Sequence, residues 1–380
     1  MTEHHTEKKN QPSLIFLETT VACDYSCRHC RANSQQFTSD DELTLEEFRN
    51  VIDQIGSIWE KKPMLVFTGG NPLMRSEIRS LLSYAHINGF PFAFSPAASN
   101  LLDDPFLRFL KINRCSSVSL SLDGISPETH DWLRRKEGSL GITLDLISSI
   151  RKAGLNLQIN TTVMHRNILE LPAIASLVRD SGVSAWEVFF LINTGRGTDV
   201  EGITPEEYMQ VNYWLSELWR YGLNVRTVEG PVFRVIQQIA EKQPSSVSGR
   251  TYQILSEELD SIIDEPGSLK IRKKAQIPAN HGGTLFISHN GDVFPSGLFS
   301  LRLGNVRGEN LQSIMDRNSD LTGTAIREKL RGKCGYCEFR YRCGGSRARA
   351  LYSAGDAFGP DPLCLYTPKI KGGDMEIAFN

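Results

Sequence analysis

Short apolar runs alternate with helical patterns along the first half of the chain. The strand-like runs cover residues 14–20, 64–70, 91–98, 116–124, 156–163 and 185–192. A helical pattern follows each run, and one of these patterns begins with the capping box Thr44-Leu-Glu-Glu47. Six β-α units in succession favour parallel strands with right-handed crossovers. We therefore expect an α/β fold, either an open doubly wound sheet or a barrel-like curl.

Chemically unusual stretches follow four of these strands. In both types of α/β fold, ligands bind at the carboxyl ends of the strands. We therefore expect the functional site to draw on residues 23–30, Gly69-Gly70-Asn71-Pro72, Asp123-Gly124 and Gly195-Arg196-Gly197.

The second half of the chain changes character. Residues 203–265 look helical, and a Pro-, Gly- and Lys-rich connection follows. Residues 284–297 then read as a hairpin with Asn290-Gly291 at its turn. We expect a domain boundary near residue 270. The expected organisation is a disordered tail (1–13), a core domain (14–230), a helical or linker segment (231–283) and a small C-terminal domain (284–380).

Composition narrows the classes of function. Lys and Arg number 42 and Asp and Glu 44, a net charge of −2, so no basic surplus favours nucleic acid. The basic run at 270–274 is too short to change this. The polar amino terminus has no apolar signal region, and no run approaches the roughly 20 apolar residues of a membrane span. We expect a cytoplasmic protein without membrane or nucleic-acid partners, whose eight reduced cysteines serve metal binding or catalysis.

Cys23, Cys27 and Cys30 form a C-x3-C-x2-C group among polar and charged neighbours. That composition is unusual for buried packing. A zinc site of three cysteines and His29 is possible, but His29 stands between two of the ligands. A [4Fe–4S] cluster normally takes four thiolates, so three would leave one iron open to a substrate or cofactor. The iron–sulfur interpretation therefore explains why the group has three cysteines and not four.

The cysteine loop after the first strand, with Gly-Gly-x-Pro after the second, resembles the radical S-adenosylmethionine (SAM) superfamily. The resemblance implies a partial (β/α)6 TIM-like barrel, with SAM bound to the open iron through its methionine part. It also implies a flavodoxin- or ferredoxin-type electron donor. In this family, one electron cleaves SAM to a 5′-deoxyadenosyl radical, which abstracts hydrogen from a substrate C–H bond.

The resemblance also implies contacts to SAM. Gly69 and Gly70, with Asn71 and Pro72, resemble the loop whose backbone meets the methionine amino group. Asn71 stands where relatives often have Glu or Asp, and a neutral carbonyl accepts from an ammonium more weakly. His29 stands where an aromatic residue is usual.

Four further positions match family contacts. Ser121 and Asp123 match a position that contacts the SAM ribose region. Arg134 matches an arginine that pairs with the SAM carboxylate, and Asn160 matches a polar contact to SAM. For Ser121, Asp123 and Asn160, ordinary strand-end chemistry remains an alternative, and for Arg134 a surface charge. Arg135 stands where relatives often carry glycine.

A second group has the spacing C-x2-C-x5-C and a distant fourth cysteine: Cys334, Cys337, Cys343 and Cys364. A zinc knuckle is one interpretation. The group also resembles the SPASM extension of radical SAM enzymes, which implies one fully ligated auxiliary [4Fe–4S] cluster. Ser296 and Arg347 stand where relatives carry cysteines for another cluster. Two [4Fe–4S] clusters in all are therefore expected, with Cys115 left as a buried thiol.

The resemblance covers residues 14–200 and 284–366. The run CEFRYRCGGSRARA is similar to the radical SAM enzymes of haem d1 and alternative haem biosynthesis, which implies a small-molecule or tetrapyrrole substrate. A peptide-modifying maturase is the alternative. Only 13 polar residues precede the first strand, so a leader-binding module would be a separate protein. A non-catalytic iron–sulfur or zinc protein, acting as electron carrier or scaffold, is the remote alternative.

Overall fold

A computed structural model of the chain describes residues 11–240, 249–263 and 283–368. It divides into two compact units that interleave along the sequence. The first unit comprises 1–121, 134–157 and 278–326, and the second 122–133, 158–277 and 327–380. Of the expected tail over 1–13, residues 1–10 lie outside the described residues, and so does the basic run at 270–274.

The first unit is built on a mixed sheet with the strand order β10-β9-β8-β1-β2-β3-β4. Strand β1 pairs in parallel with β2 on one side and with β8 on the other. Strands β9 and β10 continue the sheet antiparallel. The bounds are β1 Leu14–Glu18, β2 Met64–Thr68, β3 Phe92–Phe94, β4 Ser117–Ser121, β8 Thr284–Ile287, β9 Asp292–Phe294 and β10 Gly304–Asn305.

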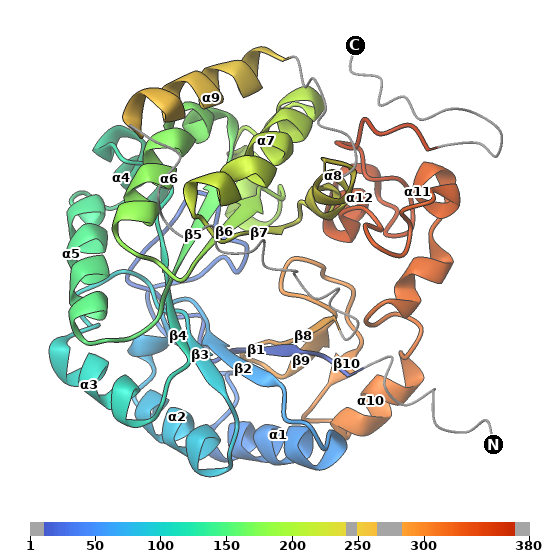
Figure 1. Ribbon diagram of the computed structural model, residues 1–380. Coiled ribbons are helices and arrows are strands. Elements are labelled where there is room, and N and C mark those ends of the chain that lie inside the picture. Colours follow the sequence, from blue (N-terminus) through green and yellow to red (C-terminus); the bar gives the residue numbers. More distant parts are fainter. Residues whose placement is uncertain (1–10, 241–248, 264–282, 369–380) are drawn as a thin grey trace. The chain divides into compact units, whose positions relative to one another are not determined.

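Helices α1, α2 and α3 lie along one side of these strands (Figure 1). Helix α1 begins after Thr44, and the predicted capping box with Glu47 is present. Its buried face includes Phe48 and Ile52, and burying a side chain of this size contributes about 1.5–3 kcal/mol. The helices of this unit are α1 Leu45–Ile58, α2 Ile78–Ile87, α3 Asp104–Ile112, α5 Ser139–Lys152 and α10 Leu311–Arg317, while α4 (Pro127–Arg134) belongs mostly to the second unit.

The second unit holds three parallel strands in the order β5-β6-β7. Trp186 of β6 and Trp214 of α7 are buried and meet edge to face, with ring centroids 6.4 Å apart. The bounds are β5 Leu157–Val163, β6 Ala185–Phe190, β7 Val225–Val228, α6 Leu171–Asp180, α7 Pro205–Glu217, α8 Val232–Ala240, α9 Arg250–Ile262, α11 Gly332–Tyr336 and α12 Arg347–Ala354.

The six predicted strands are present as β1 to β6, although only Phe92–Phe94 of the run 91–98 is a strand. The predicted hairpin is present as β8 and β9, with Gly291 at φ +90° in its turn. The sequence did not predict β7, which falls within a stretch that looked helical. No described helix is long and apolar enough to cross a membrane.

Candidate functional site

The first cysteine group lies in a loop that leaves β1 and is closed by backbone hydrogen bonds. Gln35 N–H donates to Val21 O at 3.1 Å, and Cys23 N–H donates to Gln35 O at 2.8 Å. Within the loop, Cys30 N–H donates to Cys27 O at 3.2 Å, which makes the tight turn that carries His29. All three cysteines therefore belong to one short, closed loop at the carboxyl end of the first strand.

None of the three thiols forms a disulfide, and they differ in exposure. Cys23 is buried, whereas Cys27 and Cys30 are half-buried. Cys23 Sγ accepts from Tyr25 N–H at 3.4 Å, and Cys30 Sγ lies 3.4 Å from Ser34 Oγ. Burial first, and then neighbouring ionisable groups including Cys27, raise the pKa of Cys23 to about 12. A metal centre bound here would therefore have to displace a proton from this thiol.

Cationic side chains stand beside the same loop. Arg134 Nη1 lies 3.7 Å from Cys27 Sγ. Lys136 Nζ lies 3.5 Å from Asp24 Oδ2 and 4.3 Å from the Tyr25 ring centroid. Arginine and lysine form strong, charge-assisted bonds with carboxylates. The loop thus combines thiols with positive charge, as an anionic ligand would require.

The glycines after β2 pack against the backbone that leads into the cysteine loop. Gly70 N–H donates to Thr20 O at 2.8 Å, and Asn71 N–H donates to Ala22 O at 2.7 Å. A Cβ on Gly69 would stand 2.6 Å from Thr20 O, and one on Gly70 would stand 2.4 Å from Ala22 O. The cysteine loop itself therefore requires glycine at both positions. This close packing is a reason for glycine that is separate from the predicted approach of a ligand.

Asn71 links three segments through a buried amide. Its Nδ2 donates to Asp24 Oδ1 at 2.8 Å and to Ser99 Oγ at 3.2 Å, while its Oδ1 accepts from Leu73 N–H at 3.2 Å. The buried Pro72 follows and begins the short 3₁₀ helix η1 (Pro72–Met74). Asn71 therefore holds Asp24 in place within the cysteine loop.

The remaining predicted contacts lie at strand ends. Ser121 is the last residue of β4 in the first unit. In the second unit, the buried Asp123 accepts from Thr162 N–H at 2.7 Å, and Asn160 Oδ1 accepts from Gln158 Nε2 at 2.8 Å. Asp123 and Asn160 are thus engaged in contacts within their own unit, and their contact with SAM stays a prediction.

The second cysteine group surrounds a pocket within the second unit. Two backbone N–H groups point at its sulfurs: Gly345 N–H lies 3.4 Å from Cys343 Sγ, and Asp361 N–H lies 3.5 Å from Cys334 Sγ. Hydrogen bonds to sulfur are characteristic of protein iron–sulfur sites. The pocket is lined by all four cysteines, Cys334, Cys337, Cys343 and Cys364, together with Val232, Val235, Phe339, Asp361 and Tyr366.

The four cysteines are of the residue type that binds an iron–sulfur cluster or a zinc ion. Gly345 has φ +64°, and a Cβ there would stand 3.1 Å from Cys334 Sγ, so glycine keeps space free beside the sulfur. In the described part of the chain, no three His, Cys, Asp or Glu side chains are grouped to hold a single ion. A four-iron cube keeps its thiolates farther apart than one tetrahedral zinc ion does. The auxiliary [4Fe–4S] cluster and the alternative zinc knuckle both stay predictions.

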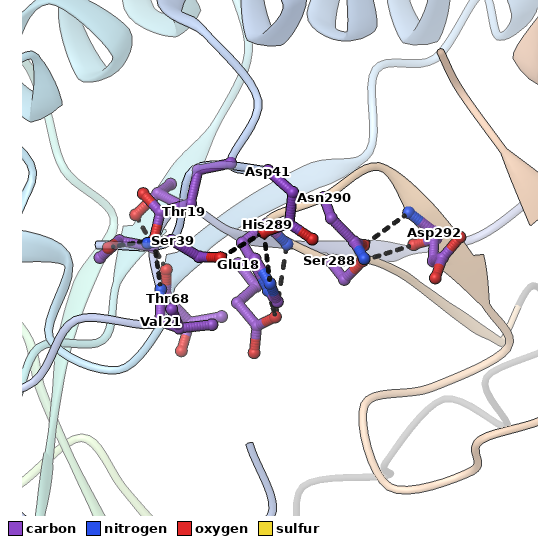
Figure 2. Close-up of polar contacts among 12 residues, drawn as sticks. Glu18, Thr19, Val21, Ser39, Asp41, Thr68, Ser288, His289, Asn290 and Asp292 are labelled. Atoms are coloured by element: carbon purple, nitrogen blue, oxygen red, sulfur yellow. Dashed lines mark hydrogen bonds and ion pairs between the residues drawn. The ribbon is translucent and has the colours of Figure 1, made fainter. Parts of the chain in front are cut away.

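Sequence reasoning missed a buried carboxylate next to the first group. Glu18, at the end of β1, is 3% exposed. Its Oε1 lies 3.0 Å from Arg31 Nη2 and its Oε2 lies 2.8 Å from His289 Nδ1; Figure 2 shows His289 turned toward Glu18. Arg31, which follows Cys30 directly, also covers the Phe286 ring at 4.3 Å. No sequence pattern indicated this contact, because Glu18 and His289 are 271 residues apart in the chain.

The chain is similar to known proteins in sequence and in fold. Residues 17–178 match the radical SAM superfamily. The chain is 32% identical to the AdoMet-dependent heme synthase of Methanosarcina barkeri, over 95% of this chain and 99% of that protein. It is 24% identical to the pre-heme d1 synthase of Dinoroseobacter shibae, over 96% of this chain and 89% of that protein. The structure of Streptococcus suis SuiB bound to SAM has a TM-score of 0.65 at 13% identity, over 93% of this chain and 77% of SuiB.

SuiB bound to its precursor peptide SuiA gives the same TM-score at 14% identity, over 93% of this chain and 76% of that chain. The predicted α/β fold of TIM-like partial-barrel type is therefore confirmed, while the separate C-terminal domain stays a prediction. The chain belongs to the radical SAM superfamily, enzymes whose fold binds SAM and a [4Fe–4S] cluster.

Proposed function

We propose that this protein is a radical SAM enzyme of tetrapyrrole biosynthesis, which abstracts hydrogen from a carboxylate-bearing side chain of the substrate. The observation that carries the proposal is the end-to-end match to a heme synthase, 32% identical over 95% of this chain and 99% of the relative. The pre-heme d1 synthase, another relative named for a tetrapyrrole product, also matches over nearly the whole chain.

In this proposal, Cys23, Cys27 and Cys30 hold a [4Fe–4S] cluster with one iron open to SAM. When bound, the cluster supplies the electron that cleaves SAM to a 5′-deoxyadenosyl radical. Arg134 contributes a guanidinium beside the cysteine loop, where a methionine carboxylate would bind. The other proposed SAM contacts are Gly69, Gly70, Asn71, Pro72, Ser121, Asp123, Asn160 and His29.

The four cysteines of the second pocket hold an auxiliary [4Fe–4S] cluster in this proposal. Because four thiolates would occupy all four irons, this cluster would serve electron transfer or structure. A flavodoxin- or ferredoxin-type protein would donate electrons to the enzyme. We propose a reducing compartment, the cytoplasm, because none of the eight cysteines, all of them within the described residues, forms a disulfide. The proposed domain bounds remain 14–230 for the core and 284–380 for the auxiliary domain.

A peptide maturase is the second candidate. It is favoured by the fold shared with SuiB, whose structure with its precursor peptide SuiA matches over 93% of this chain. At 14% identity this likeness concerns the fold alone, whereas the heme synthase match extends to sequence along the whole chain. The tetrapyrrole assignment is therefore the stronger one, and membership of an enzyme family disfavours the non-catalytic carrier.

Transfer of deuterium tests the assignment. The anaerobically reconstituted enzyme would receive SAM, a reductant and an iron tetrapyrrole whose propionate side chains are deuterated. We expect mass spectrometry to find deuterium in 5′-deoxyadenosine, and none with the unlabelled tetrapyrrole. If SAM is cleaved but deuterium never transfers from labelled propionate or acetate side chains, the tetrapyrrole assignment fails while the enzyme class stands.

A further inference from the structure

Arg347 is fixed beside the four-cysteine pocket, at a position where relatives were expected to carry a cysteine. Its Nη1 donates to Ala357 O at 3.0 Å and to Gly359 O at 2.6 Å, and its Nε donates to Gly345 O at 3.3 Å. Its Nη2 is directed at Cys334 Sγ, 3.8 Å away. The three carbonyl contacts orient the planar guanidinium, so this sulfur contact needs little further ordering.

Gly345 makes room for this contact. A Cβ at that position would stand 2.5 Å from Arg347 Nη2 and 3.1 Å from Cys334 Sγ, at the meeting point of the two groups. The same residue has φ +64°, which L side chains rarely adopt. The backbone thus leaves open the space in which guanidinium and thiol approach each other.

Among the described residues Arg347 forms no ion pair of its own, although Glu229 lies close enough for the two charges to interact. The neighbouring Asp361 is bound by Arg349, whose Nη1 lies 3.0 and 3.1 Å from the two carboxylate oxygens. In the described part of the chain, Arg347 itself donates to backbone carbonyls and to sulfur. Cys334 Sγ also receives the Asp361 N–H at 3.5 Å, so two donors converge on one sulfur.

We propose that Arg347 is a positioning residue for the auxiliary cluster, which donates to the Cys334 thiolate and raises the cluster's reduction potential. A reduced cluster carries one more negative charge than an oxidised one. Hydrogen bonds to its sulfurs and a nearby cation therefore favour the reduced state. This inference rests on the proposed second cluster.

Redox titration of the full chain tests it. A variant with Cys23, Cys27 and Cys30 replaced by Ala would leave only the second cluster to be followed by electron paramagnetic resonance. In that background, Arg347→Gln is expected to lower the reduction equilibrium constant about tenfold, equal to 59 mV for one electron. The matched control is Arg331→Gln, because Arg331 is exposed and pairs with Asp356 at 2.7 Å. We expect no shift from it.

A second measurement leaves Arg347 intact, in case its replacement prevents folding. The same triple variant, with ¹⁵N-labelled arginine, is expected to show a ¹⁵N hyperfine coupling in pulsed resonance spectra of the reduced cluster. Absence of this coupling, or equal potentials in the Arg347→Gln and Arg331→Gln variants, overturns the inference. A triple variant that binds no iron–sulfur cluster would instead overturn the proposed auxiliary cluster, and this inference with it.

Discussion

The backbone N–H of Gly70 donates to the carbonyl oxygen of Thr20 at 2.8 Å, so the loop after β2 is bonded to the chain that enters the first cysteine loop. A Cβ at Gly70 would stand 2.4 Å from Ala22 O and 2.6 Å from Val21 O. Both contacts are with backbone, which cannot turn away as a flexible side chain can. The geometry of the three thiols therefore depends on this glycine.

Gly70→Ala is expected to destabilise the protein by about 1–3 kcal/mol, as overpacking in a close-packed site does. The matched control is Gly141→Ala in α5, where a Cβ meets nothing within 4 Å. This control is expected to gain about 0.5–1 kcal/mol, because alanine is the better helix residue. Chemical denaturation measures both free energies of unfolding. Equal values for the two variants would contradict the close approach.

Arg135 directly follows α4 and has a backbone conformation that suits glycine. Its φ is +51° and its side chain is exposed. Left-handed geometry costs a non-glycine residue about 1–2 kcal/mol. Arg135→Gly is therefore expected to raise the free energy of unfolding by about 0.5–1 kcal/mol, after the larger chain entropy of unfolded glycine is subtracted. Arg135→Ala keeps the backbone strain, so its free energy of unfolding should not rise. A rise of the same size in this variant would show that the effect comes from loss of the arginine side chain.

Tyr208 carries a buried hydroxyl that has no hydrogen-bond partner among the described residues. Burial raises its pKa well above the ordinary value, so the group stays a neutral phenol. In the metal-free protein, Tyr208→Phe is expected to raise the free energy of unfolding by about 1 kcal/mol, since an unpaired polar group is removed. Tyr252→Phe is the control, because it loses a 2.6 Å bond to Glu217 and should be destabilised. Destabilisation of both variants would indicate a partner for Tyr208.

The His289–Glu18 pair predicts a pH dependence of stability. Burial lowers the pKa of His289, but the hydrogen bond and charge of Glu18, with Asp41 and Glu42, raise it above its usual value. Burial likewise raises the pKa of Glu18, yet Arg31 and His289 outweigh burial and lower it overall. The contribution of His289 is therefore fully present below a pH of about 6.5, and is lost as pH rises through the folded-state pKa.

His289→Gln should accordingly cost more stability at pH 6 than at pH 9, as measured by denaturation in each buffer. The control is His86→Gln, because His86 lies in the last turn of α2. A loss for His289→Gln that is constant across this range would show that the pair does not hold a proton-dependent charge.

The helices and strands could be predicted from the sequence, whereas the distant segments that they pair with could not. Local signals were sufficient for Thr44 as a helix cap and for Asn290-Gly291 as a hairpin turn, because the decisive contacts are only a few residues apart. The parallel pairing of β8 with β1 joins segments about 270 residues apart, and no local pattern encodes it.

At the site, the cysteine spacing identified both groups of thiols. It gave no sign that Gly69 and Gly70 pack on the cysteine loop itself, nor that Asp123 accepts from the β5 backbone. A residue's type indicates what bonds it can form, whereas the partner it meets depends on the tertiary fold.

Release of 5′-deoxyadenosine from SAM by the reduced, anaerobically reconstituted protein tests the central claim most directly. The wild type and Cys115→Ala are expected to release it, because Cys115 is a buried thiol that donates to Ser117 O at 3.3 Å, apart from both cysteine groups. Cys27→Ala is expected to release none, since it removes one of three proposed cluster ligands. No product from the wild type, or undiminished product from Cys27→Ala, would contradict the account.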